Sequence, residues 1–159
     1  MNTESNHTSP RGHSRTEFVT FRIGDALIGV DICAVEEINR HIDVTPVPHA
    51  PDNVRGVINL RGEVVTVIDL RTSLGMPATE LNERTRAVVV RSRGERIGLL
   101  VDSITGVVEG KSEDMSAPPA NVGGIEGRFF AGVHKLREEL LIVLDIDAVL
   151  SGDIVAGRT

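Results

Sequence analysis

The side chains that most often carry chemistry are sparse in this sequence and poorly spaced for joint action. His7 and His13 lie in a polar N-terminal stretch. His41, His49 and His134 have no second ligand at a spacing typical of zinc sites. No pattern places a nucleophile beside a base, or two acids where they could share a proton. We therefore expect surface or turn histidines, no bound metal and no catalytic residue.

Two other motifs have the composition of binding sites. Asp145-Ile146-Asp147 offers two carboxylates to a cation, but a strand that passes into a helix cap explains the same residues. Residues 123–127 (GGIEG) are rich in glycine, yet no strand is expected to enter them and no Lys-Ser or Lys-Thr follows, as a phosphate-binding loop requires. We expect a mobile loop there, no cofactor, and a protein that is not an enzyme.

The composition argues against several kinds of partner and compartment. The net charge is −6, and the 17 Lys and Arg residues are spread along the chain, so nucleic acid is not an expected partner. Cys33, the one cysteine of the chain, rules out an intramolecular disulfide, so we expect the reducing cytoplasm as the compartment. Because Cys33 lies in an apolar stretch, we expect it to be buried. No signal-peptide pattern and no apolar run near about 20 residues indicates membrane insertion.

Short apolar runs rich in Val, Ile and Leu, separated by turn residues, predict an all-β fold. A short helical bend is expected at residues 32–35, and prolines at 46, 48, 118 and 119 interrupt strands because they lack an N–H donor. The first half should contain five strands, at residues 17–23, 26–31, about 35–45, 54–60 and 63–70. The second half should contain five more, at residues 86–91, 96–101, 104–109, 128–136 and 140–146.

The two halves look like a diverged internal duplication, spanning residues 17–76 and 85–150. Gly24 and Gly94 each close a first hairpin, and the spacing from Gly56 to Asp69 equals that from Gly132 to Asp145. Closing five strands into a barrel would remove two exposed edges. We expect two barrel lobes with an apolar seam as a partner groove. Residues 1–16 are expected to form a disordered tail, residues 17–150 the domain and residues 151–159 a flexible end.

Several stretches of the predicted strands form a specific pattern. They are Gly29-Val30-Asp31-Ile32, Val35, Glu37-Ile38, residues 56–65 (GVINLRGEVV) and residues 67–71 (VIDLR), supported by Pro46, Pro48, Gly98, Val101-Asp102 and residues 141–146 (LIVLDI). Together they resemble the CheW family of chemotaxis coupling proteins, from about residue 18 to residue 150. The resemblance implies two five-stranded SH3-like β-barrel lobes with a few short helices. In this family the lobes are intertwined in places, so they need not coincide with the two halves.

The resemblance also implies a freestanding, non-enzymatic adaptor. One lobe would bind the regulatory domain of the histidine kinase CheA, and the groove between the lobes would receive the cytoplasmic tip of a methyl-accepting chemotaxis receptor. The protein would then lie in the cytoplasm, at membrane-associated receptor arrays. A small-ligand sensor that uses the same groove is the alternative, although few polar groups are expected there.

Site residues follow from the same resemblance. The receptor would contact Ile32, Val35, Glu37, Arg61, Ile97 and Ile104. The kinase would contact Val44, Arg55 and Gly56. Arg61, on a rigid hairpin, could donate paired hydrogen bonds to carboxylate or carbonyl oxygens, across the seam or on the receptor.

Plainer alternatives exist for these residues. Arg61 could simply precede a turn glycine, Glu37 could be a solvated strand charge, and the apolar side chains could be ordinary core. The sequence departs from the family pattern at two positions, where Arg40 replaces a frequent glycine and Thr66 a frequent proline. Arg40 adds a charge beside the expected receptor strand and so bears on partner choice.

Overall fold

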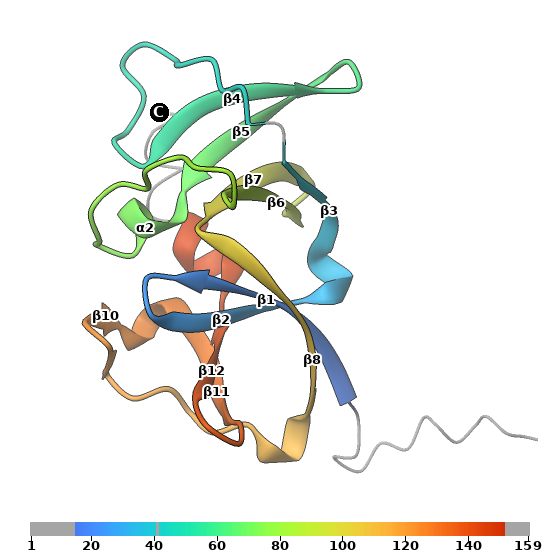
Figure 1. Ribbon diagram of the computed structural model, residues 1–159, viewed down its shortest axis with the longest axis vertical. Coiled ribbons are helices and arrows are strands. Elements are labelled where there is room, and N and C mark those ends of the chain that lie inside the picture. Colours follow the sequence, from blue (N-terminus) through green and yellow to red (C-terminus); the bar gives the residue numbers. More distant parts are fainter. Residues whose placement is uncertain (1–14, 41, 152–159) are drawn as a thin grey trace, which may run out of the picture.

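The computed structural model describes residues 15–40 and 42–151, which form two five-stranded sheets connected by short turns and helices (Figure 1). Sheet A has the order β11-β12-β2-β1-β8, with bounds β1 (Arg15–Ile23), β2 (Ala26–Asp31), β8 (Ser103–Lys111), β11 (Phe130–Lys135) and β12 (Leu140–Leu144). Sheet B has the order β3-β6-β7-β5-β4, with bounds β3 (Val35–Asn39), β4 (Val54–Leu60), β5 (Glu63–Asp69), β6 (Arg86–Ser92) and β7 (Glu95–Val101). The all-β class is confirmed, while closure of each sheet into a barrel stays a prediction.

The remaining elements are short. They are the hairpin of β9 (Asn121–Val122) and β10 (Ile125–Glu126), the single turns η1 (Ile32–Ala34), α2 (Leu70–Ser73), η2 (Ser112–Asp114) and η3 (Gly127–Phe129), and a helical segment at residues 146–151. The helical bend expected at residues 32–35 is therefore confirmed. Within the described ranges, no helix is both long enough and apolar enough to cross a membrane.

Each sheet combines strands from both halves of the chain. Sheet A joins the first hairpin, β1-β2, to the late strands β8, β11 and β12, and sheet B joins the second-half hairpin, β6-β7, to the early strands β3, β4 and β5. Each hairpin is joined to the other half by one parallel pair, β2 with β12 or β7 with β5, and by one antiparallel pair, β1 with β8 or β6 with β3. The remaining pairs in these sheets are antiparallel. The spatial lobes are therefore not the sequence halves, because the two halves exchange their first hairpins.

Side-chain alternation gives each sheet two apolar faces. In β5, Val65 and Val67 belong to a cluster made by sheet B alone, while Ile68 belongs to a larger cluster that includes residues of both sheets. In β12, Leu141 packs in a cluster of sheet A and Ile142 in the shared one. Successive side chains of a strand point to opposite faces of the sheet. Alternate apolar residues therefore fill one core on the outer face of each sheet and a third core that the two sheets share, and this shared core joins the lobes.

Several sequence-based expectations about the boundaries are wrong. The third strand ends at Asn39 and does not reach Thr45, because the chain leaves β6 there and Thr45 instead pairs with Val57. Arg15 and Thr16 are not part of a tail, since the long β8 pairs with both. Residue 151, expected in the flexible end, belongs to a helical segment. Residues 1–14, 152–159 and His41 lie outside the described residues.

Three expectations about single features are also wrong. The expectation that no strand enters residues 123–127 is overturned, because Gly123 and Gly124 form the turn of the β9-β10 hairpin, where the Asn121 side chain accepts a hydrogen bond from Gly124 N at 2.9 Å. Cys33 is exposed, because it lies in the η1 turn and not in a strand. His134 is buried, with its ring 5.5 Å from that of Phe18, because it lies in β11 rather than in a turn.

Asp102 connects the two sheets through its side chain. It follows β7 and accepts hydrogen bonds from Arg71 Nε at 2.8 Å, from Arg71 Nη2 at 2.6 Å and from Gly24 N at 2.8 Å. Arg71 lies just after β5 in sheet B, whereas Gly24 forms the β1-β2 turn in sheet A. Burial alone would raise the pKa of Asp102, but the hydrogen bonds from Arg71 and Gly24 outweigh it and hold the pKa below its usual value.

Replacing Asp102 by Asn should therefore weaken the fold in a pH-dependent way. The folded-state pKa is lowered, so the contribution of the carboxylate is complete above its unfolded pKa of about 3.9 and disappears as the pH falls through the folded value. At pH 7 we expect a loss of about 1.5 kcal/mol in the free energy of unfolding, at the lower end for a charged hydrogen bond because both side chains are partly exposed. Urea denaturation between pH 7 and pH 3 measures the difference in the free energy of unfolding between the wild type and the Asn variant, and this difference should become smaller in acid. A difference that stays constant over this range would contradict the assignment.

Candidate partner-binding site

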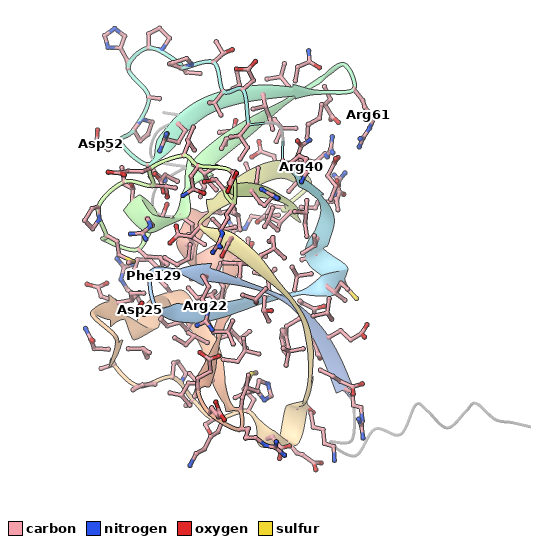
Figure 2. All side chains as sticks on the ribbon, viewed as in Figure 1. Arg22, Asp25, Arg40, Asp52, Arg61 and Phe129 are labelled. Carbon is pink, nitrogen blue, oxygen red and sulfur yellow. The ribbon has the colours of Figure 1, made fainter. Side chains whose placement is uncertain are left out.

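The β4-β5 hairpin presents Arg61 at its tip (Figure 2). Arg61 and Gly62 both have positive φ, 53° and 84°, as a two-residue type I′ turn requires. The Asn59 side chain accepts a hydrogen bond from Gly62 N at 2.9 Å and fixes the turn. The side chain of Arg61 is 73% exposed, so a rigid backbone supports an accessible guanidinium.

Glu37 in β3 pairs with this guanidinium. Arg61 Nη2 lies 2.6 Å from Glu37 Oε2, and Arg61 Nη1 lies 3.4 Å from Glu37 Oε1. The structure thus brings together two of the predicted receptor residues. In β3 the apolar Ile38 is 41% exposed, whereas the charged Glu37 is partly buried and is therefore not simply a solvated strand charge. A β-bulge between Val35 and Glu37 shifts the alternation by one residue.

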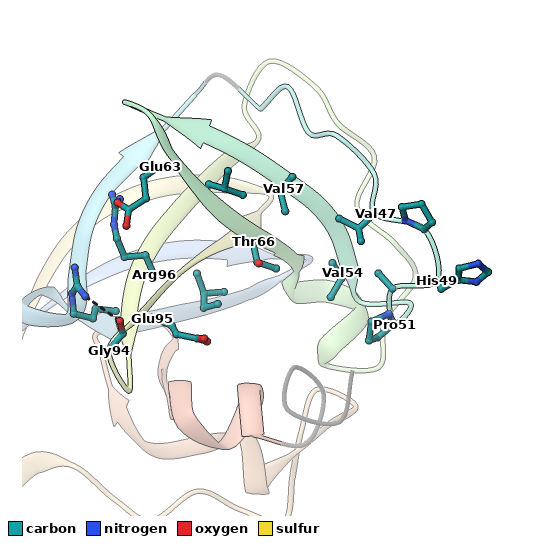
Figure 3. A pocket seen from close by; sticks show the side chains of 15 residues that line it. Val47, His49, Pro51, Val54, Val57, Glu63, Thr66, Gly94, Glu95 and Arg96 are labelled. Atoms are coloured by element: carbon teal, nitrogen blue, oxygen red, sulfur yellow. Dashed lines mark hydrogen bonds and ion pairs between the residues drawn. The ribbon is translucent and has the colours of Figure 1, made fainter. Parts of the chain in front are cut away.

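Arg96, at the start of β7, stands at the centre of a charge network. We use this term for Glu36, Glu37, Arg61, Glu63, Arg91 and Arg96. Arg96 donates to Glu36 Oε1 at 2.7 Å, to Glu37 Oε2 at 3.1 Å and to Glu63. Figure 3 labels Arg96 and Glu63. Its side chain is 12% exposed. Burial acts to lower the pKa of Arg96, but bonds to Glu63 and Glu36 outweigh it and raise the pKa above its usual value.

Glu36 forms the outer part of the network. It accepts from Arg91 Nε at 2.6 Å on its second oxygen, while its first oxygen faces Arg96. Hydrogen bonding from Arg91, followed by that from Arg96, holds the pKa of Glu36 below its usual value despite partial burial. The network thus combines three arginines with three glutamates.

A groove of about 470 Å³ runs beside this network on sheet B (Figure 3). Residues 47–51 form one wall, Val54, Val57, Thr66 and Ile97 line it, and Glu63 and Arg96 border it. Val64 also lines it and is 66% exposed. The groove thus combines an apolar lining with charged side chains at its border.

The other predicted receptor residues lie along the shared core. Ile32, Val35 and Ile104 are half-buried and pack against it, and Ile97 is buried while also lining the groove. Val35 and Ile97 both pair with Val90 of β6, on opposite sides. A core role is thus shown for each of them, and the receptor role stays a prediction.

The predicted kinase residues lie at the edge of sheet B, where two of them, Gly56 and Arg55, contribute to the fold. Gly56 has a φ of 144°, and a Cβ there would lie 2.1 Å from Thr45 O and 2.7 Å from Val44 Cγ1. Arg55 Nη1 donates to buried Asp69 at 2.9 Å and to Thr79 O at 3.0 Å. Val44 is half-buried against the core of sheet B. Contact with a kinase is untested for all three residues.

Comparison with known proteins fits this geometry. The family model described as a CheW-like domain matches residues 17–153. The chain belongs to the CheW-like family. It is 34% identical over 137 residues to the chemotaxis protein CheW of Rhizobium meliloti, covering 86% of this chain and 88% of that protein. It is 33% identical over 141 residues to CheW of Klebsiella aerogenes, covering 88% of this chain and 84% of that protein.

A solved structure agrees with the family match. The scaffolding protein TtCheW from Thermoanaerobacter tengcongensis superposes with a TM-score of 0.77 and 28% identity, covering 83% of this chain and 90% of that one. These comparisons support a scaffold function for this CheW-like protein. They give no support to a small-ligand sensor, the alternative that the sequence left open.

Four residues of the charge network were not among the predicted site residues: Arg96, Arg91, Glu36 and Glu63. One signal was available in the β6-β7 hairpin, whose turn at Gly94 places Arg91 directly opposite Arg96. Like charges in directly opposed positions are destabilising. Such a pair in a CheW-like chain therefore indicates nearby carboxylates, and Glu36 in β3 bonds to both arginines.

The motifs considered for metals have structural explanations. Asp145 Oδ1 accepts a hydrogen bond from Ala148 N at 3.1 Å, so it caps the helical segment at residues 146–151, as the plainer alternative proposed. Across residues 15–40 and 42–151, no group of three or more His, Cys, Asp and Glu side chains could hold a metal ion.

Substitution of Gly56 by Ala should destabilise the fold itself, whether or not Gly56 contacts a partner. The new Cβ would collide with the backbone of Thr45, which cannot move without breaking the pair of bonds with Val57. We expect a loss of about 3 kcal/mol, at the upper end for overpacking, in the free energy of unfolding measured with urea. Gly62→Ala is the control, because a Cβ at that position would have no atom within 4 Å and only the positive φ is strained. Equal losses in the two variants would show that the contact with Thr45 is unimportant.

Proposed function

We propose that this protein is a chemotaxis adaptor that couples methyl-accepting receptors to the histidine kinase CheA. The observation that carries the proposal is the CheW-like family match, which extends over residues 17–153. The receptor tip would contact Ile32, Val35, Glu37, Arg61, Ile97 and Ile104, and the regulatory domain of CheA would contact Val44, Arg55 and Gly56. The protein would act in the cytoplasm, at membrane-associated receptor arrays.

The geometry of Arg61 supports its place at the receptor contact. A guanidinium has five N–H groups, and two of those on Arg61 are directed at Glu37. With 73% of its side chain exposed, Arg61 can offer further N–H groups to a carboxylate or carbonyl of the receptor. Pairing with Glu37 limits the rotamers of Arg61, so less entropy is lost on binding.

Coupling requires that the receptor and kinase contacts move together. Most residues of the two contacts lie in or beside sheet B, and Ile104 lies in β8 of sheet A. The two sheets are joined by the common core and by Asp102. A receptor displacement can then change the conformational equilibrium of the kinase without any turnover of substrate. Single contacts of micromolar Kd, about −8 kcal/mol each, become stable in an array because the partners are held at high effective concentration.

Mixing experiments test this proposal directly. The full chain is combined with a CheA regulatory-domain fragment and, separately, with a receptor signalling fragment, and complexes are detected by gel filtration. We expect binding to each, and receptor control of CheA autophosphorylation only when the adaptor is present. Absence of both complexes would refute the proposed function.

Arg61→Ala should fold normally but fail to couple receptor to kinase. Its ion pair with Glu37 is solvent-exposed and contributes at most about 1 kcal/mol to stability. Loss of a charged hydrogen bond to the receptor should cost about 1.5–3 kcal/mol of binding free energy. Isothermal titration with the receptor fragment measures this loss, while affinity for the kinase fragment should be unchanged.

Arg128→Ala is a matched control for this variant. Arg128 is also exposed, at 69%, and also pairs with a single carboxylate, that of Glu126. It lies in η3, next to sheet A, far in the sequence from the network. If Arg61→Ala couples receptor and kinase like the wild type, or if Arg128→Ala is equally defective, the assignment of Arg61 is wrong.

A further inference from the structure

The carboxylate of Glu37 is shared between two guanidiniums of different exposure. Its Oε2 lies 2.6 Å from Arg61 Nη2 and 3.1 Å from Arg96 Nη2. Arg61 is 73% exposed and Arg96 is 12% exposed. One carboxylate therefore connects a fixed cation to an accessible one.

Arg96 is fixed because three carboxylates from two other strands surround it. Glu36 and Glu37 come from β3, and Glu63 from the start of β5. In sheet B, β3 and β5 are not neighbours, since β6 and β7 lie between them. Arg96 thus bridges the edge strand that carries Glu37 to the hairpin whose tip carries Arg61.

Without this bridge, the pair of Arg61 and Glu37 would be an ordinary surface ion pair. Such pairs contribute little because two long side chains must lose rotamer freedom to meet in water. Arg96, only 12% exposed, removes that freedom from one partner by binding Glu37 Oε2. A planar guanidinium with five donors can serve three carboxylates at once, which a Lys ammonium, as a compact point charge, does less well.

We propose that Arg96 is a positioning residue for receptor binding, which acts by holding Glu37 so that Glu37 orients Arg61. Arg96 itself does not contact the receptor. The oriented guanidinium then selects a receptor surface that presents a carboxylate or main-chain carbonyl oxygen to the hairpin tip. This inference rests on the proposed adaptor function and assigns a role to a residue that the family resemblance did not single out.

A double-mutant cycle on the full chain tests the inference. Affinity for the receptor signalling fragment is measured by isothermal titration for the wild type, Arg96→Gln, Arg61→Ala and the double variant. We expect Arg96→Gln to weaken binding five- to tenfold in the wild-type background and less than twofold when Arg61 is already Ala. A residue that only supports the local fold would weaken binding by the same factor in both backgrounds, and that result would overturn the proposal, as would unchanged affinity of Arg96→Gln.

Arg91→Gln is the matched control within the network. Arg91 bonds to Glu36 and to Gly94 O but has no bond to Glu37 among the described contacts. It should leave receptor affinity within twofold of the wild type. A loss equal to that of Arg96→Gln would mean that the network as a whole, and not the path through Glu37, matters, and would overturn the proposal.

Two further readouts keep the test decisive. NMR relaxation of the Arg61 Nε–H group should show greater side-chain motion in Arg96→Gln, because Glu37 no longer fixes the orientation of Arg61. Unchanged motion would contradict the proposal that Arg96 orients Arg61 through Glu37. If Arg96→Gln fails to fold, Arg96→Lys takes its place in the cycle. The Lys variant retains the charge and should still lose affinity, and full retention would overturn the proposal.

Failure of the inference and failure of the proposed function give different results. If the wild type binds the receptor and kinase fragments and Arg96→Gln does the same with equal affinity, only the role of Arg96 is wrong. If the wild type binds neither fragment, the proposed function is wrong, and the inference falls with it.

Discussion

The parallel pairing of β5 with β7 is the constraint on which the rest of the structure depends. Antiparallel neighbours can be joined by a tight turn, but parallel neighbours need a longer connection. Here the connection runs through α2 and the segment that leads to β6, and the partner strand comes from the other half of the chain. The same arrangement joins β12 to β2 in sheet A. The two halves of the chain therefore cannot separate without breaking strand pairs in both sheets.

This pairing also sets the ends of the two strands side by side. Thr66 is in register with Ile97, and Asp69 with Leu100. At the beginning of the pair Glu63 therefore meets Arg96, and beyond its end Arg71 meets Asp102. One pair of strands thus carries the charge network that faces a partner and the contact that ties the sheets together.

Local properties of the sequence predicted much of the fold. Runs of β-branched residues and turn glycines predicted most strands to within two residues, and paired Gly24 and Gly94 correctly with hairpin turns. The exchange of hairpins could not be predicted from local sequence, because the alternation of apolar and polar residues in a strand is the same whether it pairs with a strand of its own half or of the other half. The exposure of Ile38 could not be predicted either, since a β-bulge changes the facing of β3 without any change in its composition.

The candidate site was predicted only in part, for a related reason. Arg61 and Glu37 came from motif resemblance, and the structure places them in contact. Arg96 was missed because its partners lie 59, 60 and 33 residues away in the sequence. Several motif residues also proved to have structural roles, as Asp69 accepts bonds from Arg55 and Thr79 inside the protein and Asp102 ties the sheets. A motif alone does not separate these roles from partner contact.

The exchanged hairpins have a consequence for the history of such a chain. A single half, with its five strands, would lack the hairpin that completes its own sheet, and could obtain one only by giving its first hairpin to a second copy. Two copies that swap the same element in this way form a closed, two-fold symmetric dimer. Covalent fusion of such a dimer would give the strand order seen here, and would free the once-identical surfaces to diverge toward different partners.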